Sequence, residues 1–293
     1  GRHVLQHGVR RRSEQDHRLD EAVGRRARHG LSGRSLARPL KPYARSQPYV
    51  FRVIRSAFGR FPRECPVCGY HGHFFAYGNP YALGVNVDAL CPRCMSLERH
   101  RLWAICEKTH GLIPGKDVLH FAPEPGLRDY VVARGPRSYT TTDYMDDSAD
   151  LKLNIEKLDV GDGTYDLVIC SHVLEHVNDT LAIPELFRIV RPGGILLAMV
   201  PLFEGWDRSF EDASKTARKE DRILYFNQHD HVRAYGKDFR TRLSSAGFEL
   251  EEFTAVEPDV SRYGLLRGEK VFICRKAALA MPLAVAAGAA ARM

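Results

Sequence analysis

YDLVICSHVLEHVNDTLAIPELFRIVRPGGILLAMVP, residues 165–201, decides the fold of this chain. Residues 165–171 are almost continuously apolar, and so are residues 195–200 near the end of the stretch. Such runs are typical of strands that are buried on both faces of a sheet. Between them, residues 184–190 predict a helix with a proline in its first turn, and RPGG at 191–194 predicts a turn. The stretch therefore predicts a strand, a helix and a second strand of a parallel sheet.

Strands and helices also alternate on both sides of this stretch, which favours one α/β domain. We expect Ser96 to cap the first helix and Gly111 to end it. The expected elements outside the stretch are a helix at 96–111, a strand at 117–121, a helix at 126–134, strands at 138–143 and 150–155, a polar segment at 203–235, a helix at 237–246, and strands at 248–255 and 270–275.

The loop in VLHFAPEPGLRDYV (118–131) follows a predicted strand, where nucleotide-binding proteins carry a glycine-rich loop. Here Gly126 is the only glycine, and Glu124 stands in the middle of the loop. A glutamate would repel the phosphates of NAD, FAD or ATP. It would instead attract S-adenosylmethionine (SAM), which has no phosphate and carries a positive sulfonium and a positive ammonium. Asp143, at the end of the next predicted strand, is placed to bind ribose hydroxyls.

Residues 165–201 resemble the fourth strand, helix and fifth strand of class I SAM-dependent methyltransferases, in particular the broad type 11 group. The chain is also similar to a bacterial family of uncharacterised methyltransferases, through CPRCMSLERHRLW (91–103), FAPEPG (121–126), SHVLEHV (171–177) and FNQHDHVRAYG (226–236). The resemblance implies a Rossmann-like, seven-stranded, mostly parallel sheet with a small N-terminal zinc ribbon. It also implies a set of SAM-binding positions: His120, Ala122, Glu124, Gly126, Asp143, Tyr144, Asn154, Ile155, Ser171 and His172.

Four of the seven cysteines form two CxxC pairs, CPVC (65–68) and CPRC (91–94). Each pair can supply two thiolates to one ion, and two pairs complete a tetrahedral Zn²⁺ site with no open position. We therefore expect Cys65, Cys68, Cys91 and Cys94 to bind a structural zinc ion that holds together a segment too small to form its own core. His71, His73 and His100 lie nearby, and we expect hydrogen-bonding or surface roles for them. The remaining cysteines are expected to be buried thiols: Cys106, Cys170 and Cys274.

Candidate catalytic residues follow the predicted strands at their carboxyl ends, where ligands bind in open α/β sheets. We expect His231 to act as a base, with Asp230 orienting it and Arg233 binding an acidic group of the acceptor. His172 is a further candidate. The alternative is that 230–233 forms a hydrogen-bonded lid anchor. Glu175 and His176 are expected to cap or pack in a helix, and a metal bound by three consecutive residues, 229–231, is disfavoured because their side chains point apart.

The net charge of +7 is unevenly distributed. Residues 1–60 contain fourteen Arg, one Lys and four acidic residues, a net charge of +11, so the rest of the chain carries −4. No run of 18 apolar residues occurs, so we expect no membrane span. The metal-type cysteine spacing favours a reducing, cytoplasmic location. The expected organisation is a basic irregular arm (1–60), a zinc ribbon with a helix (61–111), a methyltransferase domain (115–276) and a flexible Ala-rich tail (277–293).

Three functions stay open. The preferred one is methyl transfer to an oxygen or nitrogen of a small molecule or glycan, because the charge outside the arm is negative. CSHV (170–173) contains neither the [D/N]PP[Y/F] block of base-amine methyltransferases nor a Pro-Cys nucleophile. The second is an RNA methyltransferase that grips RNA with the arm and a basic, aromatic ribbon surface. The third is a non-catalytic zinc-ribbon interaction protein with a relic methyltransferase fold. The ribbon surface would consist of Arg93, Arg99, His100 and Arg101 with Phe74, Phe75 and Tyr77.

Overall fold

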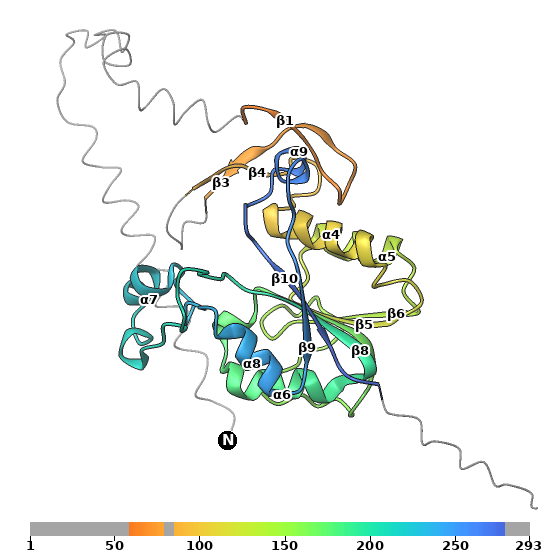
Figure 1. The fold of residues 1–293 in the computed structure, drawn as a ribbon, viewed down its shortest axis with the longest axis vertical. Helices are drawn as coiled ribbons and strands as arrows, with labels where there is room; N and C mark the ends of the chain where they lie inside the picture. The colour runs from red at the N-terminus through yellow and green to blue at the C-terminus, as the bar shows by residue number, and fades with distance from the viewer. Residues whose placement is uncertain (1–58, 79–84, 279–293) are drawn as a thin grey trace, which may run out of the picture. The chain divides into compact units, whose positions relative to one another are not determined.

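The computed structural model describes residues 59–78 and 85–278. The predicted basic arm lies outside these ranges except for its last two residues, and so does the predicted tail except for its first two. Within the described residues, one six-stranded sheet forms the centre of the fold (Figure 1). Its strands are β5 (Asp117–Phe121), β6 (Ser138–Thr142), β7 (Tyr165–Ser171), β8 (Val190–Met199), β9 (Glu249–Phe253) and β10 (Val271–Arg275).

The strands lie in the order β6-β5-β7-β8-β10-β9. The first four are parallel, and β10 runs antiparallel to both β8 and β9. The mostly parallel α/β sheet is thus confirmed, but the described residues contain six of the seven expected strands. The prediction of a strand at 150–155 is wrong, because this segment forms only single bridges, such as that from Leu151 to Thr142. The Asp150 carboxylate accepts hydrogen bonds from the backbone N–H and the hydroxyl of Thr141. The N–H of Thr141 in β6 is therefore not available to pair with a strand at 150–155.

Two further predictions within 165–201 need correction. The helix between the strands, α6 (Asp179–Ile189), begins earlier than expected, so Pro184 lies inside it rather than in its first turn. The helix begins there because the Asn178 side chain accepts the Thr180 N–H, a standard N-cap. RPGG is not a separate turn but part of β8, which pairs irregularly with β7 near this point, and Gly193 adopts a left-handed φ of 80°.

Helices cover both faces of the sheet (Figure 1). On one face lie α4 (Glu98–His110) and α5 (Pro125–Ala133), and on the other lie α6 and α8 (Phe239–Ser245). Gly111 ends α4 in a left-handed conformation, as predicted. Leu97, not Ser96, caps α4; the Ser96 hydroxyl instead contacts two cysteine sulfurs. The remaining helices are the short 3-10 turns at Leu174–His176 and Ala213–Lys215, α7 (Lys219–Phe226) and α9 (Asp259–Tyr263).

The cysteine-rich segment packs against α4 and α9 of this domain. It contains two antiparallel strand pairs, and one buried side chain of α4, Arg101, connects it to the rest of the chain. The Arg101 guanidinium donates to the carbonyls of Ala89, Ser96, Tyr263 and Gly264 at 2.7–2.8 Å. The strands of the segment are β1 (Pro62–Glu64), β2 (His71–His73), β3 (Phe75–Tyr77) and β4 (Asn86–Leu90).

None of the helices in residues 59–78 and 85–278 combines the length and the apolar character of a membrane span.

Candidate functional site

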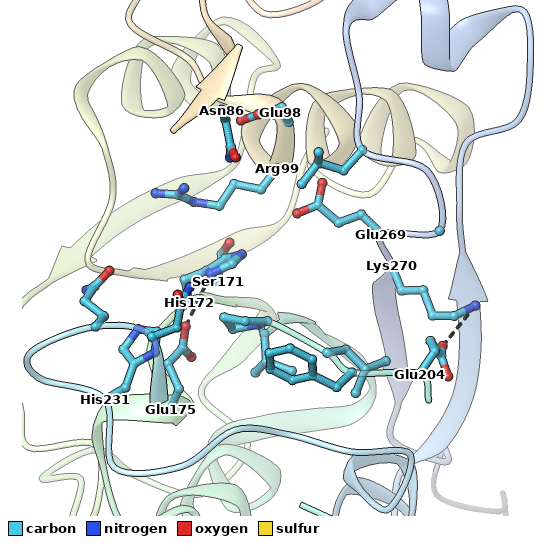
Figure 2. A pocket seen from close by; sticks show the side chains of 18 of the residues that line it. Asn86, Glu98, Arg99, Ser171, His172, Glu175, Glu204, His231, Glu269 and Lys270 are labelled. Carbon is cyan, nitrogen blue, oxygen red and sulfur yellow. Dashed lines mark ion pairs between the residues drawn. The ribbon is translucent and has the colours of Figure 1, made fainter. Parts of the chain in front are cut away.

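A cavity of about 740 Å³ lies at the carboxyl ends of β5, β7 and β8 (Figure 2). In the sheet, β6 lies on one side of β5 and β7 lies on the other, so the strand order reverses direction at β5. The cavity therefore lies at a topological switch point, which is where open α/β sheets bind their ligands. Three parts of the chain form the walls of this cavity: the cysteine-rich segment with α4, the ends of the strands, and two later loops. The lining residues are Tyr77 and Asn86 of the cysteine-rich segment, Glu98 and Arg99 of α4, Ala122 and Glu124 after β5, Ser171, His172, Glu175 and His176 at the end of β7, residues 200–204 after β8, Asn227, Gln228 and His231, and residues 266–270.

Two neighbouring strands end here in the same unusual way. Ala122 follows β5 with φ of 46°, and His172 follows β7 with φ of 54°. Left-handed conformations are uncommon for residues other than glycine, and they cluster at functional sites. The Ala122 N–H donates to the Thr142 carbonyl, and the His172 N–H donates to the Met199 carbonyl. The chain therefore turns sharply after each strand, while the first residue of the turn remains hydrogen-bonded to the neighbouring strand. The two turns direct the chain away from the edge of the sheet and leave space there.

Glu124 carries a negative charge on the cavity wall. Its Oε1 lies 2.6 Å from His100 Nε2 and 3.4 Å from the Arg99 guanidinium. His100 Nδ1 accepts the Leu97 N–H, so its Nε2 carries the proton that is donated to Glu124. Burial would raise the pKa of Glu124, but the His100 hydrogen bond and the Arg99 charge outweigh it and lower the pKa to about 2. Burial lowers the pKa of His100 against the opposite effect of Glu124, which favours the neutral ring.

Glu269 also lines the cavity and lies on the side of Glu98 and Arg99 (Figure 2). Its Oε2 is buried and receives no hydrogen bond. Burial and the Glu98 charge raise the pKa of Glu269 from 4.5 to about 7, against the smaller opposite effect of Arg99 and Arg101. A carboxyl group that titrates near neutrality in a cavity can accept or release a proton at physiological pH.

We expect Glu269→Gln to change the pH dependence of stability. The folded state disfavours the charged carboxylate, so the contribution of Glu269 to the free energy of unfolding should fall as pH rises from 4.5 to about 7. Gln cannot ionise, so at pH 8 the variant should be more stable than wild type by about 1–3 kcal/mol, and at pH 4.5 the gap should disappear. Urea unfolding across this range measures it, with the exposed Glu249→Gln as control. A gap that does not change with pH would contradict the assignment.

A third group of side chains lies at the other end of the cavity. His172 Nδ1 lies 3.3 Å from Glu175 Oε1, and the His231 ring packs edge-on against that of His176 with ring centroids 4.7 Å apart. Figure 2 shows His172, Glu175 and His231 converging there. His231 Nδ1 lies 3.0 Å from the Phe226 carbonyl and donates to it, which leaves a lone pair on Nε2. Burial lowers the pKa of His231, which favours the neutral ring.

Of the predicted SAM-binding and catalytic residues, the structure brings five to this cavity: Ala122, Glu124, Ser171, His172 and His231. Sequence reasoning had assigned Glu175 and His176 to helix packing, yet both line the cavity. Their position in SHVLEHV, directly after a buried strand, was the signal available for them.

Four predicted positions lie outside the cavity wall. Asp143 follows β6 at the same edge of the sheet, and its Oδ1 accepts the N–H groups of Met145 and Asp146. Tyr144 is exposed, and Asn154 is exposed with its side chain accepting the Glu156 N–H. Ile155 is buried in the core beneath α6. The ribose and adenine positions implied by the resemblance thus stay predictions.

Two other predicted positions are structural. His120 is fully buried, with Nδ1 3.0 Å from the Tyr139 hydroxyl and its ring stacked on Trp103, so it does not reach the cavity. Gly126 packs against the ribbon: a Cβ there would lie 2.6 Å from the Cys94 carbonyl oxygen. The glycine is therefore needed for close packing of α5 on the cysteine turn.

Arg233 and Asp230 also lie off the cavity wall. The buried Arg233 guanidinium pairs with Asp179 and Glu211 and donates to the carbonyls of Leu174 and Val177. It is thus committed to the fold, which corrects the prediction that it binds the acceptor. Asp230 Oδ1 accepts from the Gln228 side chain, and Oδ2 lies 3.5 Å from His176 Nδ1. Asp230 therefore faces His176, not His231 as predicted.

The four cysteines form a compact cluster in two matching turns. Sγ of Cys65 lies 3.6 Å from that of Cys94, and Sγ of Cys68 lies 3.7 Å from that of Cys91. All four sulfurs lie within 4.8 Å of one another. These distances are far too long for disulfides, but a tetrahedron of bonds of about 2.3 Å separates its sulfurs by about 3.8 Å. The cluster therefore has the geometry of a closed tetrahedral metal site.

The basic, aromatic ribbon surface predicted for RNA does not form as expected. Phe74, His100 and Arg101 are buried, and Arg101 lies over the Phe74 ring at 4.4 Å. Phe75 stays exposed, while Tyr77 contributes to the cavity wall. Of the four basic residues predicted for this surface, Arg101 instead holds the cysteine-rich segment against the domain, whereas Arg93 is exposed and Arg99 lies on the cavity wall.

A sequence model of the family described as "Methyltransferase domain" matches residues 67–252, and this chain belongs to that family. Family membership supports methyl transfer and SAM as the methyl donor. The comparison with curated proteins found no match.

Several solved structures are similar to this one at low identity. A SAM-dependent methyltransferase from Mesorhizobium loti is 12% identical, with 59% of this chain and 97% of the other covered and a TM-score of 0.45. The 1,6-didemethyltoxoflavin-N1-methyltransferase of Burkholderia thailandensis is 17% identical, with 60% and 76% covered and a TM-score of 0.41. The YcgJ protein of Bacillus subtilis is 13% identical, with 60% and 94% covered and a TM-score of 0.41.

Proposed function

We propose that this protein transfers a methyl group from SAM to an oxygen or nitrogen of a small molecule or glycan. The observation that carries the proposal is the acidic cavity at the switch point of a methyltransferase-family sheet. Its walls hold five glutamates against two arginines and one lysine. An excess of carboxylates repels phosphorylated cofactors and attracts a cationic one.

The residues present fit the methionine half of SAM. Glu124 stays ionised, and in the proposal it receives the ammonium group of SAM. The cavity of about 740 Å³ has the size of a cofactor site. Asp143 Oδ2 receives no hydrogen bond from the described residues, so it can accept one from a ribose hydroxyl. Bound SAM supplies an activated methyl group; the chain's residues position the acceptor and handle its proton.

His172, Glu175 and His231 form the acceptor end in this proposal. His231 Nε2 has a lone pair that can take a proton or bind a cation, and the hydrogen bond from His231 Nδ1 to the Phe226 carbonyl holds this ring in place. The cysteine cluster has no open position, so we assign it a structural zinc ion rather than a role in the reaction. These residues belong to a cytoplasmic enzyme in our proposal, because thiolate clusters of this kind persist in reducing compartments.

The test incubates purified protein with methyl-labelled SAM and a bacterial extract divided into RNA, protein, glycan or lipid, and small-molecule fractions. We expect label in the small-molecule or glycan fraction. Label in RNA would replace this proposal by an RNA methyltransferase. No label, together with no calorimetric SAM binding, would support a non-catalytic role of the fold.

We expect Asp143→Asn to weaken SAM binding by about 10- to 100-fold, because a charge-assisted hydrogen bond to a ribose hydroxyl contributes about 1.5–3 kcal/mol. Asn retains an oxygen for the N–H groups of Met145 and Asp146, so the loop should keep its shape. Titration calorimetry measures the affinity. Asp147→Asn, an exposed carboxylate in the same loop that pairs with Lys152, is the control and should bind as wild type. Equal SAM affinities of the two variants would show that Asp143 does not bind SAM.

A further inference from the structure

Glu175, His176 and His231 bring three metal-ligand atoms together at the acceptor end of the cavity. One atom from each residue lies within 4.8 Å of the other two. Apart from the cysteine cluster, no other group of this kind occurs in residues 59–78 and 85–278. His231 is far from the other two residues in sequence, and the hydrogen bond from the Val232 N–H to the Glu175 carbonyl holds the two segments together. The grouping is therefore a product of the fold.

Both imidazoles have their Nδ1 side engaged by an oxygen. His231 Nδ1 donates to the Phe226 carbonyl at 3.0 Å, and His176 Nδ1 lies 3.5 Å from Asp230 Oδ2. Metal-binding histidines usually donate their second ring N–H to a carbonyl or carboxylate, which fixes the tautomer and leaves Nε2 for the ion. The two rings thus carry the outer contacts that a metal site uses.

Glu175 is the buried member of the group. Its side chain is 1% exposed, and neither carboxylate oxygen receives a hydrogen bond; the nearest partner is His172 Nδ1 at 3.3 Å. A buried carboxylate without donors costs several kcal/mol unless a cation compensates it. The oxygens lie at the wall of the cavity that also exposes His231 (Figure 2). A cation bound here would compensate a charge whose only contact of this kind is the long one with His172.

We propose that Glu175, His176 and His231 bind a divalent transition-metal ion at the acceptor end of the cavity. Two histidines and one carboxylate form a set that binds such ions and leaves coordination positions open to a substrate. The open positions face the cavity, where an acceptor hydroxyl can bind. The class of acceptor is then a hydroxyl compound, and this part of the inference rests on the proposed function.

The reaction balances with this arrangement. The ion lowers the pKa of the acceptor hydroxyl, whose proton passes to water. An oxygen lone pair forms the new bond to the methyl carbon, and the electron pair of the S–CH₃ bond returns to sulfur. The products are a methyl ether and S-adenosylhomocysteine. In this arrangement His231 binds the ion and is not the general base.

The test titrates Mn²⁺ into the zinc-loaded protein and follows free Mn²⁺ by electron paramagnetic resonance. Mn²⁺ prefers a carboxylate such as Glu175 to thiolates, whereas the thiolates of the cysteine cluster retain zinc. We expect one bound Mn²⁺ per chain, and binding weakened at least tenfold by Glu175→Gln and by His176→Gln. His229→Gln, a neighbouring histidine outside the three, is the matched control and should bind as wild type. Wild type without bound Mn²⁺, or both variants binding as tightly as wild type, overturns the proposal.

Two further measurements keep the result unambiguous. Wild-type crystals soaked in MnCl₂ should show an anomalous difference peak among the three side chains, which requires no variant to fold; a peak elsewhere overturns the site. Calorimetric SAM binding is measured separately. SAM binding without Mn²⁺ binding would contradict the metal site and leave the proposed function standing. Mn²⁺ binding without SAM binding would support the metal site and contradict the proposed function.

Discussion

Arg101→Met is expected to lower the free energy of unfolding by at least about 3 kcal/mol, a large fraction of the stability of a typical domain. Arg101 is 0% exposed, and its guanidinium is the donor to four carbonyls from three separate segments. Methionine fills much of the space but donates nothing, so buried carbonyls lose their partners at about 1–3 kcal/mol each. Urea unfolding of the zinc-loaded protein measures the effect.

Arg99→Met is the matched control for Arg101. It lies two residues earlier on α4, its side chain is 28% exposed, and its ion pair with Glu124 is long at 3.4 Å. Such pairs contribute about 0–1 kcal/mol, so the control should unfold nearly as wild type does. Arg101→Lys should lie between the two, since an ammonium keeps the charge but cannot reach all four carbonyls. Similar losses for Arg99→Met and Arg101→Met would show that Arg101 has no special role.

Arg101 also shows where sequence reasoning reached its limit. The run of basic residues in SLERHR looks like a surface patch, because charge in a sequence does not reveal burial. Gly126 is a second case. A glycine after a strand is expected both in a cofactor-binding loop and at a close packing contact. The position of the Cys94 carbonyl next to Gly126 shows that close packing requires the glycine here. His231 meets Glu175 through folding over more than fifty residues, which no local pattern encodes.

Features set by local chemistry were predictable. The strand at 165–171 was predicted with its observed bounds because its apolar run requires cover on both faces. The four cysteines came together as the spacing predicted, because each CxxC turn places two sulfurs side by side. The prediction of a strand at 150–155 was wrong because the Asp150 side chain accepts the Thr141 N–H, which that strand would have needed as a backbone donor. Such competition between a side chain and the backbone is local, but its outcome depends on the neighbouring strand.

Removal of zinc is expected to unfold the cysteine-rich segment. Cys65 and Cys91 belong to a small cluster in which Phe74 is the one fully buried aromatic side chain, too little to hold these turns by apolar packing. Binding of a structural zinc ion supplies about 10–16 kcal/mol, so its loss should exceed the stability of the segment. Under a strong chelator, hydrogen exchange should show that residues 61–78 and 85–97 lose protection, while β7 and β8 exchange slowly.

The effect should reach the cavity, because the ribbon contributes Tyr77 and Asn86 to its wall and the Cys94 carbonyl packs on the first turn of α5. We therefore expect Cys68→Ser to lower the zinc content by one equivalent per chain and to weaken SAM binding as well. Cys106→Ala is the control: that thiol is buried in α4, outside the cluster, and its loss should leave the zinc content unchanged. A Cys68→Ser protein with full zinc content would show that the cluster does not bind the ion. Lost zinc with unchanged exchange in residues 61–78 and 85–97 would show that Arg101 and α4 alone hold the cysteine-rich segment in place.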